Sequence, residues 1–310
     1  MMLDKVIAAA SAQAVRRVWI VSDLQQQYPQ RATHCMTRAV DDFLSLRMPC
    51  DAVCYLGDAV EGHDPGFLME MARMQREQLS RVQAPVYYVL GNHDFDYFAY
   101  HERTLSGMRL PFWEFVRPLP QWHTQETLSD LYYTADLGEF ALCFLTDHAD
   151  AAGRWYTTHG EIRGDSTLYP YSPDDYRAVM AQVAGLKKPV ITLSHYAFAG
   201  GNRAAPLYDR FLPLPDNVRM HFYGHAHIGD SVWAGKDCHR KVAAVDGQPV
   251  MQVNVASLEN YRGSAIRSVL LEWYAAGEIG VLFRNHTLRC WDDCLLTRPG
   301  DGLRAGEAAT

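Results

Sequence analysis

The heptapeptide Tyr88-Val89-Leu90-Gly91-Asn92-His93-Asp94 joins an apolar run to three consecutive polar side chains. Residues 86–90 predict a buried strand, because a continuous apolar run of this length is typical of a strand covered on both faces. In open α/β sheets, ligands bind at the carboxyl ends of strands. The position therefore favours a site where Asn, His and Asp bind a metal ion or move a proton. The same residue types also favour turns, so this stretch alone leaves both interpretations open.

The composition is that of an ordinary globular protein. The chain has 310 residues, of which 48% are hydrophobic and 21% charged, and its net charge is -7. The acidic balance argues against non-specific binding to a phosphate backbone. Seven scattered cysteines fit reduced thiols in a cytoplasmic protein. Neither a signal peptide nor an apolar run that could span a membrane is recognisable, so we expect a cytoplasmic protein with no membrane partner.

Apolar runs and helical spacing alternate outward from the heptapeptide. Strands are predicted at residues 18–21, 52–56 and 86–90, and helices at 33–47 and 65–82. The first part of the chain is therefore β-α-β-α-β, which is the pattern of parallel strands joined by helices.

The second part of the chain adds mainly strands. Residues 132–137 and 140–145 predict a hairpin, and Ser172-Pro173-Asp174-Asp175 predicts the start of a helix that ends near Gly185. Further strands are predicted at residues 189–193, 218–223, 250–255, 266–274 and 279–283. We expect one α/β layered domain at residues 18–287, with two packed mixed β-sheets flanked by helices. An N-terminal segment (1–17) and a C-terminal tail (288–310) would flank it.

Five predicted strand ends carry side chains that bind metal ions. They are Asp23 with Gln25, Asp58, Asn92 with His93, His195, and His225 with His227. Carboxylates, imidazoles and a side-chain amide suit Mn²⁺, Fe or Zn²⁺, with Mg²⁺ as an alternative. The set is too large for one ion and fits two divalent ions about 3.5–4 Å apart that share a carboxylate.

The ordered set Asp-x-Gln, Gly-Asp, Gly-Asn-His-Asp, His and Gly-His-x-His resembles the calcineurin-like metallophosphoesterase superfamily over roughly residues 18–283. The resemblance implies a four-layer sandwich of two sheets between helices. It also implies a first metal held by Asp23, Gln25, Asp58 and His227, and a second held by Asp58, Asn92, His195 and His225. Asp58 would bridge the two ions, and His93 would lie beyond them as proton donor or phosphate contact.

One position departs from the superfamily pattern. Its first motif is usually Asp-x-His, whereas Gln25 stands here in place of the histidine. A neutral amide oxygen is a harder and weaker donor than imidazole, so we expect a looser first site that favours Mn²⁺ or Mg²⁺ over Zn²⁺. Asp-x-Gln is similar to the manganese-dependent ADP-ribose/CDP-alcohol diphosphatase branch. This similarity favours a small-molecule phosphodiester or nucleotide pyrophosphate, attacked by a hydroxide that bridges the two metals.

Additional residues are candidates for supporting roles. Glu61 and Asp94 are candidates for the acid that holds the ring of His93. Arg203, or Arg31 together with His34, could clamp a non-bridging phosphate oxygen.

Three other functions remain open at this point. The chain could be a phosphomonoesterase or protein phosphatase of the same fold. It could also be an inactive binding scaffold, for which Gln25 is the sequence argument, although Asp58 and the final His-x-His are both intact. A nuclease would need a basic groove, against which the acidic balance argues. The sequence does not indicate the oligomeric state.

Overall fold

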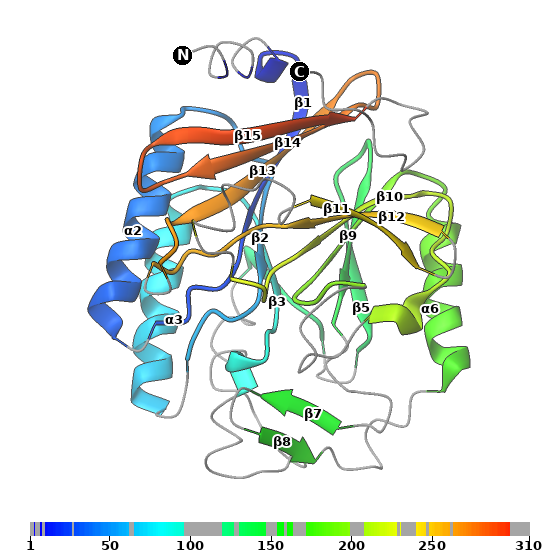
Figure 1. The fold of residues 1–310 in the computed structure, drawn as a ribbon, viewed down its shortest axis with the longest axis horizontal. Helices are drawn as coiled ribbons and strands as arrows, with labels where there is room; N and C mark the ends of the chain where they lie inside the picture. Colours follow the sequence, from blue (N-terminus) through cyan, green and yellow to red (C-terminus); the bar gives the residue numbers. More distant parts are fainter. Residues whose placement is uncertain are drawn as a thin grey trace.

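The fold is taken from a computed structural model of the chain (Figure 1). It describes residues 10–26, 28–61, 65–95, 120–126, 130–146, 154–157, 160–163, 172–198, 208–227, 240–245, 248–260 and 263–297, together with residues 3, 7 and 230.

The first sheet has seven strands in the order β15-β14-β13-β1-β2-β3-β4. Its parallel strands are β1 (Ala14–Val21), β2 (Ala52–Leu56), β3 (Val86–Val89) and β4 (Trp122–His123). The antiparallel strands are β13 (Arg267–Tyr274), β14 (Ile279–Asn285) and β15 (Cys290–Thr297).

The second sheet has six strands in the order β11-β12-β10-β9-β6-β5. Its parallel centre is β12 (Gln248–Asn254), β10 (Val218–Tyr223), β9 (Val190–Ser194) and β6 (Ala141–Leu145). The antiparallel edges are β11 (Arg240–Val245) and β5 (Tyr132–Asp136). A separate two-stranded sheet consists of β7 (Arg154–Thr157) and β8 (Gly160–Arg163).

In the described part of the chain, three helices cover the outer faces of the two sheets. Helices α2 (Pro29–Ser45) and α3 (Pro65–Ser80) lie on the first sheet, and α6 (Pro173–Gly185) lies on the second (Figure 1). Short 3₁₀ turns follow β3 and β9, at η1 (His93–Phe95) and η2 (Tyr208–Phe211). The chain is therefore layered helix, sheet, sheet, helix, as expected from the sequence.

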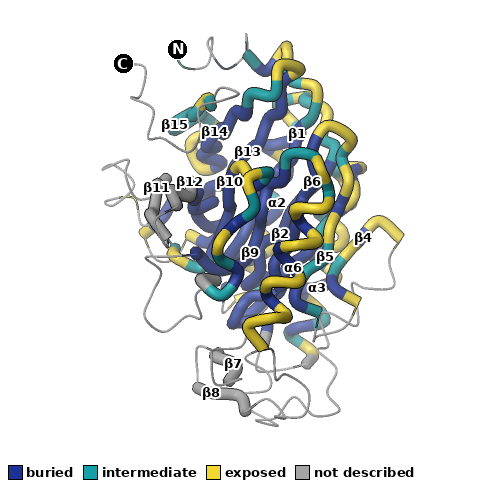
Figure 2. Tube along the Cα trace, turned by 90° about the vertical axis from the view of Figure 1, so that its right-hand side faces the viewer, coloured by how far each residue is buried: buried dark blue, intermediate teal, exposed yellow. Residues whose placement is uncertain are grey.

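Alternation along β1 shows why both faces of the first sheet are apolar. Trp19 and Val21 belong to the core under the helices, where Trp19 stacks on Phe43 at 4.3 Å between ring centroids. Val18 and Ile20 belong to the core between the two sheets. Successive side chains of a strand point to opposite faces, so a strand with a layer on each side must be apolar throughout. Figure 2 shows that the strands of both sheets are mostly buried, whereas exposed residues lie along the outer side of α6.

Most predicted elements are found within a few residues of their predicted ends. The hairpin of β5 and β6 is confirmed. The start of α6 is confirmed as well, since the Asp175 carboxylate accepts a 2.6 Å hydrogen bond from the backbone nitrogen of Ser172. Helix α2 begins at Pro29, one turn before the predicted residue 33, because proline is tolerated in the first turn of a helix.

Two boundaries of the predicted domain differ from the structure. Strand β1 begins at Ala14, inside the segment that was set apart as residues 1–17. Residues 290–297 form the edge strand β15, although residues 288–310 were expected to be a tail. Two aspartates interrupt the apolar pattern of β15, and the structure pairs one of them, Asp292, with Nε of Arg267 at 2.7 Å. Within the described part of the chain, no helix has the length and apolar character needed to cross a bilayer.

Candidate metal centre

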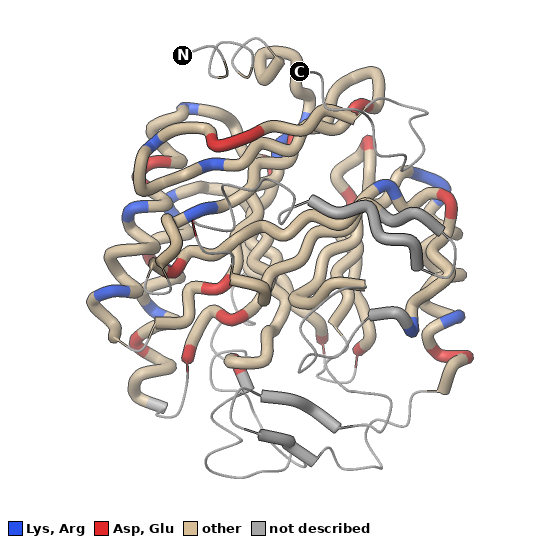
Figure 3. Tube along the Cα trace, viewed as in Figure 1, with Lys and Arg blue, Asp and Glu red and all other residues tan. Residues whose placement is uncertain are grey.

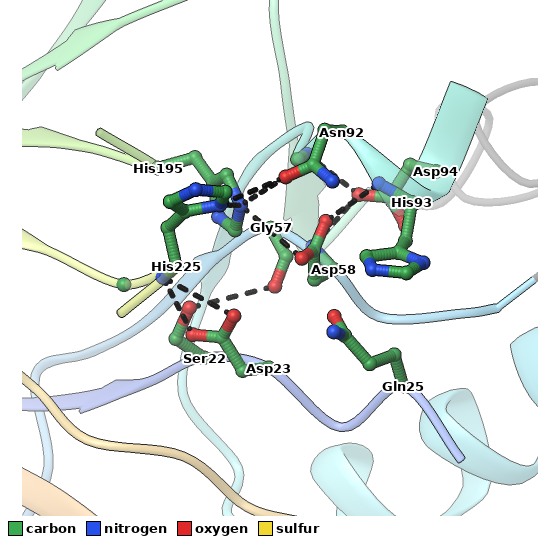
Figure 4. Close-up of polar contacts among 12 residues, drawn as sticks. Ser22, Asp23, Gln25, Gly57, Asp58, Asn92, His93, Asp94, His195 and His225 are labelled. Carbon is green, nitrogen blue, oxygen red and sulfur yellow. Dashed lines mark hydrogen bonds and ion pairs between the residues drawn. The ribbon is translucent and has the colours of Figure 1, made fainter. Parts of the chain in front are cut away.

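The predicted ligands meet where the two sheets converge (Figure 4). Asp23, Asp58 and Asn92 follow the parallel strands of the first sheet, and His195 and His225 follow β9 and β10 of the second. Asp23, Asp58 and His195 are 0% exposed. The strand ends therefore bring chemistry-bearing residues from both sheets into one buried cluster.

Glycines allow the loops to approach this closely. A Cβ atom on Gly91 would lie 2.3 Å from Oδ1 and 2.4 Å from the backbone nitrogen of Asp58. A Cβ atom on Gly224 would lie 2.6 Å from Oδ2 of Asp23. All three distances are far below van der Waals contact, so only glycine fits before the ligand residues in these two motifs.

Several ligand residues have a left-handed backbone. The φ angles are 57° at Asp23, 54° at Asp58, 65° at His225 and 36° at His227. Such angles are uncommon outside glycine, although Asp and His adopt them more readily than most residues. Backbone strain of this kind concentrates at functional sites, where the surrounding structure enforces it.

One ligand cluster combines residues from both sheets around Asn92. Its Oδ1 lies 3.1 Å from Nε2 of His195 and 2.9 Å from Nδ1 of His225. Nε2 of His195 is also 3.2 Å from Oδ2 of Asp58. On the other side of the ring, Nδ1 of His195 lies 2.7 Å from the carbonyl oxygen of Leu56, so it carries the proton that this carbonyl accepts.

A second ligand cluster surrounds His227. Its Nε2 lies 3.1 Å from Oδ1 of Asp23 and 2.9 Å from Nε2 of Gln25. Its Nδ1 makes a short hydrogen bond with Oε1 of Glu259. Both oxygens of Asp23 accept hydrogen bonds from the backbone nitrogen of His225, at 3.1 and 3.0 Å, so the two clusters are joined.

Comparison with known proteins identifies the family. The family model for calcineurin-like phosphoesterases matches residues 16–229. The chain belongs to this family. No curated protein sequence matches the chain.

Three solved structures resemble this calcineurin-like phosphoesterase in fold. A dimetal phosphatase from Danio rerio is 14% identical, with 91% of this chain and 98% of that chain covered and a TM-score of 0.61. A purple acid phosphatase from yellow lupin (Lupinus luteus) seeds is 16% identical, with 96% and 56% covered and a TM-score of 0.55. GAP50, described as the anchor in the inner membrane complex of Plasmodium, is 13% identical, with 91% and 88% covered and a TM-score of 0.50.

The side chains of this phosphoesterase fit two divalent ions. Two groups have their ligand atoms within 4.8 Å of one another: Asp58, His195 and His225, and Asp23, Asp58 and His227. Among the described residues, Asp58 Oδ2, Gln25 Oε1 and His225 Nε2 are buried without a hydrogen-bond partner. Because Nδ1 of His195 donates to Leu56, its Nε2 presents a lone pair to the Asp58 carboxylate, which is favourable only with a proton or a cation between them. A metal-dependent phosphoester hydrolase is the activity that this family and these groups support.

The charges of the ligand side chains also favour bound cations. Burial favours the neutral acid, but the charges of His195 and His93 outweigh it and hold the pKa of Asp58 well below its usual range. Burial likewise disfavours the charged imidazole, yet the Asp58 carboxylate raises the pKa of His195 to about 9. In the other cluster, the carboxylates of Asp23 and Glu259 overcome burial and raise the pKa of His227 to about 10. The carboxylates therefore attract positive charge at the places where metal ions are expected.

His93 is placed beside the shared ligand. Its backbone nitrogen donates a 2.8 Å hydrogen bond to Oδ1 of Asp58, and the residue is 4% exposed. Figure 4 shows the imidazole next to Asp58 and Gln25. Glu61, expected to support this ring, is buried on the segment after β2, and that role stays a prediction.

Asp94 links the two loops that carry Asp58 and Asn92. Its carboxylate accepts hydrogen bonds from the backbone nitrogens of Asp58 at 3.0 Å, Ala59 at 3.0 Å and Gly91 at 2.7 Å, and from the hydroxyl of Tyr88 at 3.0 Å. These bonds fasten the loop after β2 to the loop after β3. Asp94 thus holds the backbone at Asp58 in place, and its expected role beside the ring of His93 stays a prediction.

Of the predicted phosphate clamps, Arg31 and His34 lie in the described part of the chain, where neither contacts the ligand clusters, and their role stays a prediction. Arg31 and His34 are exposed in the first turns of α2, where the guanidinium of Arg31 lies 5.4 Å from the ring centroid of Tyr28. Arg203 lies outside the described residues.

Glu259 is the residue that sequence reasoning missed. It is 0% exposed and follows β12 by five residues. An acid shortly after an apolar strand run was a usable signal, because every other member of the site also follows a strand.

Proposed function

We propose that this protein hydrolyses a phosphodiester or nucleotide pyrophosphate with two divalent metal ions, of which Mn²⁺ is favoured. The observation that carries the proposal is the shared position of Asp58. It belongs to both groups of possible metal ligands, and a carboxylate between two ions is the arrangement of dimetal phosphoesterases.

The ligand sets follow from the two clusters. Asp23, Gln25, Asp58 and His227 would hold the first ion, and Asp58, Asn92, His195 and His225 would hold the second. When bound, two such ions polarise phosphoryl oxygens and lower the pKa of water. The chain itself supplies fixed carboxylates and imidazoles that balance the ionic charge without rearrangement.

His93 is proposed as the group that gives a proton to the leaving oxygen. Its backbone is tied to Asp58 by the 2.8 Å hydrogen bond, which keeps the residue beside the shared ligand. An imidazole can donate a proton near neutral pH, which is the requirement for a general acid here.

Gln25 supports the choice of substrate class and metal. In the sequence it stands where the superfamily's first motif usually has histidine, and its Nε2 lies 2.9 Å from Nε2 of His227. Half a turn of the amide exchanges its nitrogen and oxygen, so Gln25 can offer an oxygen ligand. Oxygen donors favour Mn²⁺ or Mg²⁺ over Zn²⁺. The Asp-x-Gln motif is similar to that of phosphodiester and pyrophosphate hydrolases.

A phosphomonoesterase is the second candidate. The Danio rerio and lupin structures that share the fold are both named phosphatases. A nuclease is less favoured, because Lys and Arg are interspersed with Asp and Glu on the flanking helices of the described chain (Figure 3). A nuclease would present a basic stripe.

Hydrolysis of two chromogenic esters separates the candidates. Metal-stripped protein is refilled with Mn²⁺, Mg²⁺ or Zn²⁺ and tested on bis-p-nitrophenyl phosphate and p-nitrophenyl phosphate, with Asp58→Asn as the control. We expect faster turnover of the diester than of the monoester, dependent on Mn²⁺ and lost in Asp58→Asn. In that case ADP-ribose is tested next, and we expect it to be hydrolysed. Preference for the monoester would establish the second candidate. No turnover with any metal in folded protein would leave a binding scaffold.

A further inference from the structure

The imidazole of His227 is held between two carboxylates. On one side, Nε2 lies 3.1 Å from Oδ1 of Asp23. On the other side, Nδ1 is hydrogen-bonded to Oε1 of Glu259. Glu259 is 0% exposed, so its charge is not screened by water. Nε2 of the ring can therefore bind a metal ion, while Nδ1 is already hydrogen-bonded to Glu259.

Backbone contacts fix Glu259 independently of its side chain. Its nitrogen donates a 3.1 Å hydrogen bond to the carbonyl oxygen of Asp23, and the nitrogen of Leu258 donates a 3.0 Å bond to the carbonyl oxygen of Ser22. The hydroxyl of Ser264 donates a 3.2 Å bond to the carbonyl oxygen of Glu259. The loop after β12 is thereby tied to the end of β1, which holds the backbone of Glu259 next to that of Asp23.

We propose that Glu259 is a positioning residue for the first metal site. It accepts the Nδ1 proton of His227, which leaves the Nε2 lone pair facing Asp23 and the metal position. A carboxylate behind a metal-binding histidine also strengthens the histidine as a ligand. Such support matters in this chain because Gln25 contributes a neutral amide where the superfamily has an imidazole. The inference rests on the proposed dimetal function.

In the second metal site, a neutral backbone carbonyl and not a carboxylate lies behind the histidine ligand His195. The effect of Glu259 should therefore be specific to the first site. In the second site, the Nδ1 of His195 lies 2.7 Å from the carbonyl oxygen of Leu56, a neutral partner. Removing the charge of Glu259 should therefore weaken only the site that contains His227.

Binding of Mn²⁺ to metal-stripped protein tests this inference. Wild type, Glu259→Gln and the surface control Glu139→Gln are titrated by calorimetry. The coupled spectrum of a Mn²⁺ pair is followed by electron paramagnetic resonance. We expect two ions in wild type and in the control. In Glu259→Gln, one of the two affinities should fall about 10–100-fold, and the coupled spectrum should fade at the concentrations that suffice for wild type.

Equal affinities in wild type and folded Glu259→Gln would overturn the inference while leaving the dimetal function intact. Should Glu259→Gln not fold, Glu259→Asp retains the charge and withdraws it by one methylene. A fall in one affinity in that variant supports the inference, and two unchanged affinities overturn it. A wild-type protein that binds no Mn²⁺ would instead refute the proposed function on which the inference rests.

Discussion

Nδ1 of His195 lies 2.7 Å from the carbonyl oxygen of Leu56, and this contact joins the two sheets. His195 follows β9 of the second sheet, and Leu56 ends β2 of the first. The bond fixes the imidazole tautomer and directs Nε2 to Oδ2 of Asp58, 3.2 Å away. The relative position of the two sheets therefore determines the geometry of the metal centre. A substitution that separates the strand ends should both destabilise the fold and weaken metal binding.

Gly91→Ala should disrupt the centre. Its Cβ would lie 2.3 Å from Oδ1 of Asp58, so the shared ligand or the loop after β3 must move. We expect a loss of about 3 kcal/mol in the free energy of unfolding, together with loss of Mn²⁺ binding. Urea unfolding and calorimetric titration measure the two effects.

Gly185→Ala is the matched control for this substitution. Gly185 is the last residue of α6, and an added Cβ would meet nothing within 4 Å. Its stability should change by no more than about 1 kcal/mol, with Mn²⁺ binding retained. Equal effects of the two substitutions would contradict the close approach of Gly91 to Asp58.

Gln25→His should shift the metal preference of the first site toward Zn²⁺. An imidazole is a softer donor than an amide oxygen. We expect the ratio of Zn²⁺ to Mn²⁺ affinity to rise about tenfold, which equals about 1.4 kcal/mol. Competition with a chelator measures both affinities. The exposed Gln121→His controls for zinc binding to an added surface histidine, and an unchanged ratio in Gln25→His would show that residue 25 is not a ligand.

Asp42→Ala should destabilise the fold without touching the metal centre. The buried Asp42 accepts two 2.8 Å hydrogen bonds from Arg284 and lies 2.8 Å from Nδ1 of His286. Removal of one partner from a buried ionic network costs about 3–5 kcal/mol. The lost stability should appear in urea unfolding, with Mn²⁺ affinity unchanged in the folded protein.

Asp41→Ala offers a comparison one residue away. Asp41 is 44% exposed and pairs with Arg81 at 2.6 Å. Exposed pairs contribute about 0–1 kcal/mol, so this variant should unfold almost as wild type does. Similar losses at positions 41 and 42 would contradict the buried network.

His221 should make the fold less stable in mild acid. Its ring is 0% exposed, with Nε2 2.9 Å from the carbonyl oxygen of Tyr196. Burial lowers the pKa of His221 from 6.5 to about 4. Between about pH 4 and pH 6.5, His221 is therefore protonated in the unfolded chain and neutral in the folded chain. The contribution of neutral His221 is fully present above pH 6.5 and is lost as the pH falls toward about 4, by up to about 3 kcal/mol.

Comparison of wild type with His221→Gln in metal-free protein isolates this effect. The difference in unfolding free energy between the two should shrink as the pH falls from about 7 to about 4. Urea unfolding at several pH values measures the difference, and a constant difference would refute the assignment to His221.

The sequence was sufficient for most of the strands and for the polar residues at their ends, because both follow local rules; that these residues bind metal ions stays a prediction. Continuous apolar runs mark buried strands, and Gly-Asp and Gly-His-x-His mark their ends. Contacts between segments far apart in the sequence could not be predicted in this way. Asp42 occupies a polar position in its helix but is buried against Arg284, 242 residues away. Glu259 lies outside any periodic pattern and acquires its role only when the loop after β12 meets His227. Periodicity reports which face of an element is apolar and cannot show which charge on another element compensates a buried one.

Anomalous scattering from crystals grown with Mn²⁺ tests the dimetal centre most directly. The account predicts two peaks, one among Asp23, Asp58 and His227 and the other among Asp58, His195 and His225, with Asp58 contacting both. Glu259 should lie behind His227 and outside the coordination sphere of either ion. A single peak, or peaks that exclude Asp58, would contradict the shared carboxylate and with it the proposed dimetal hydrolase.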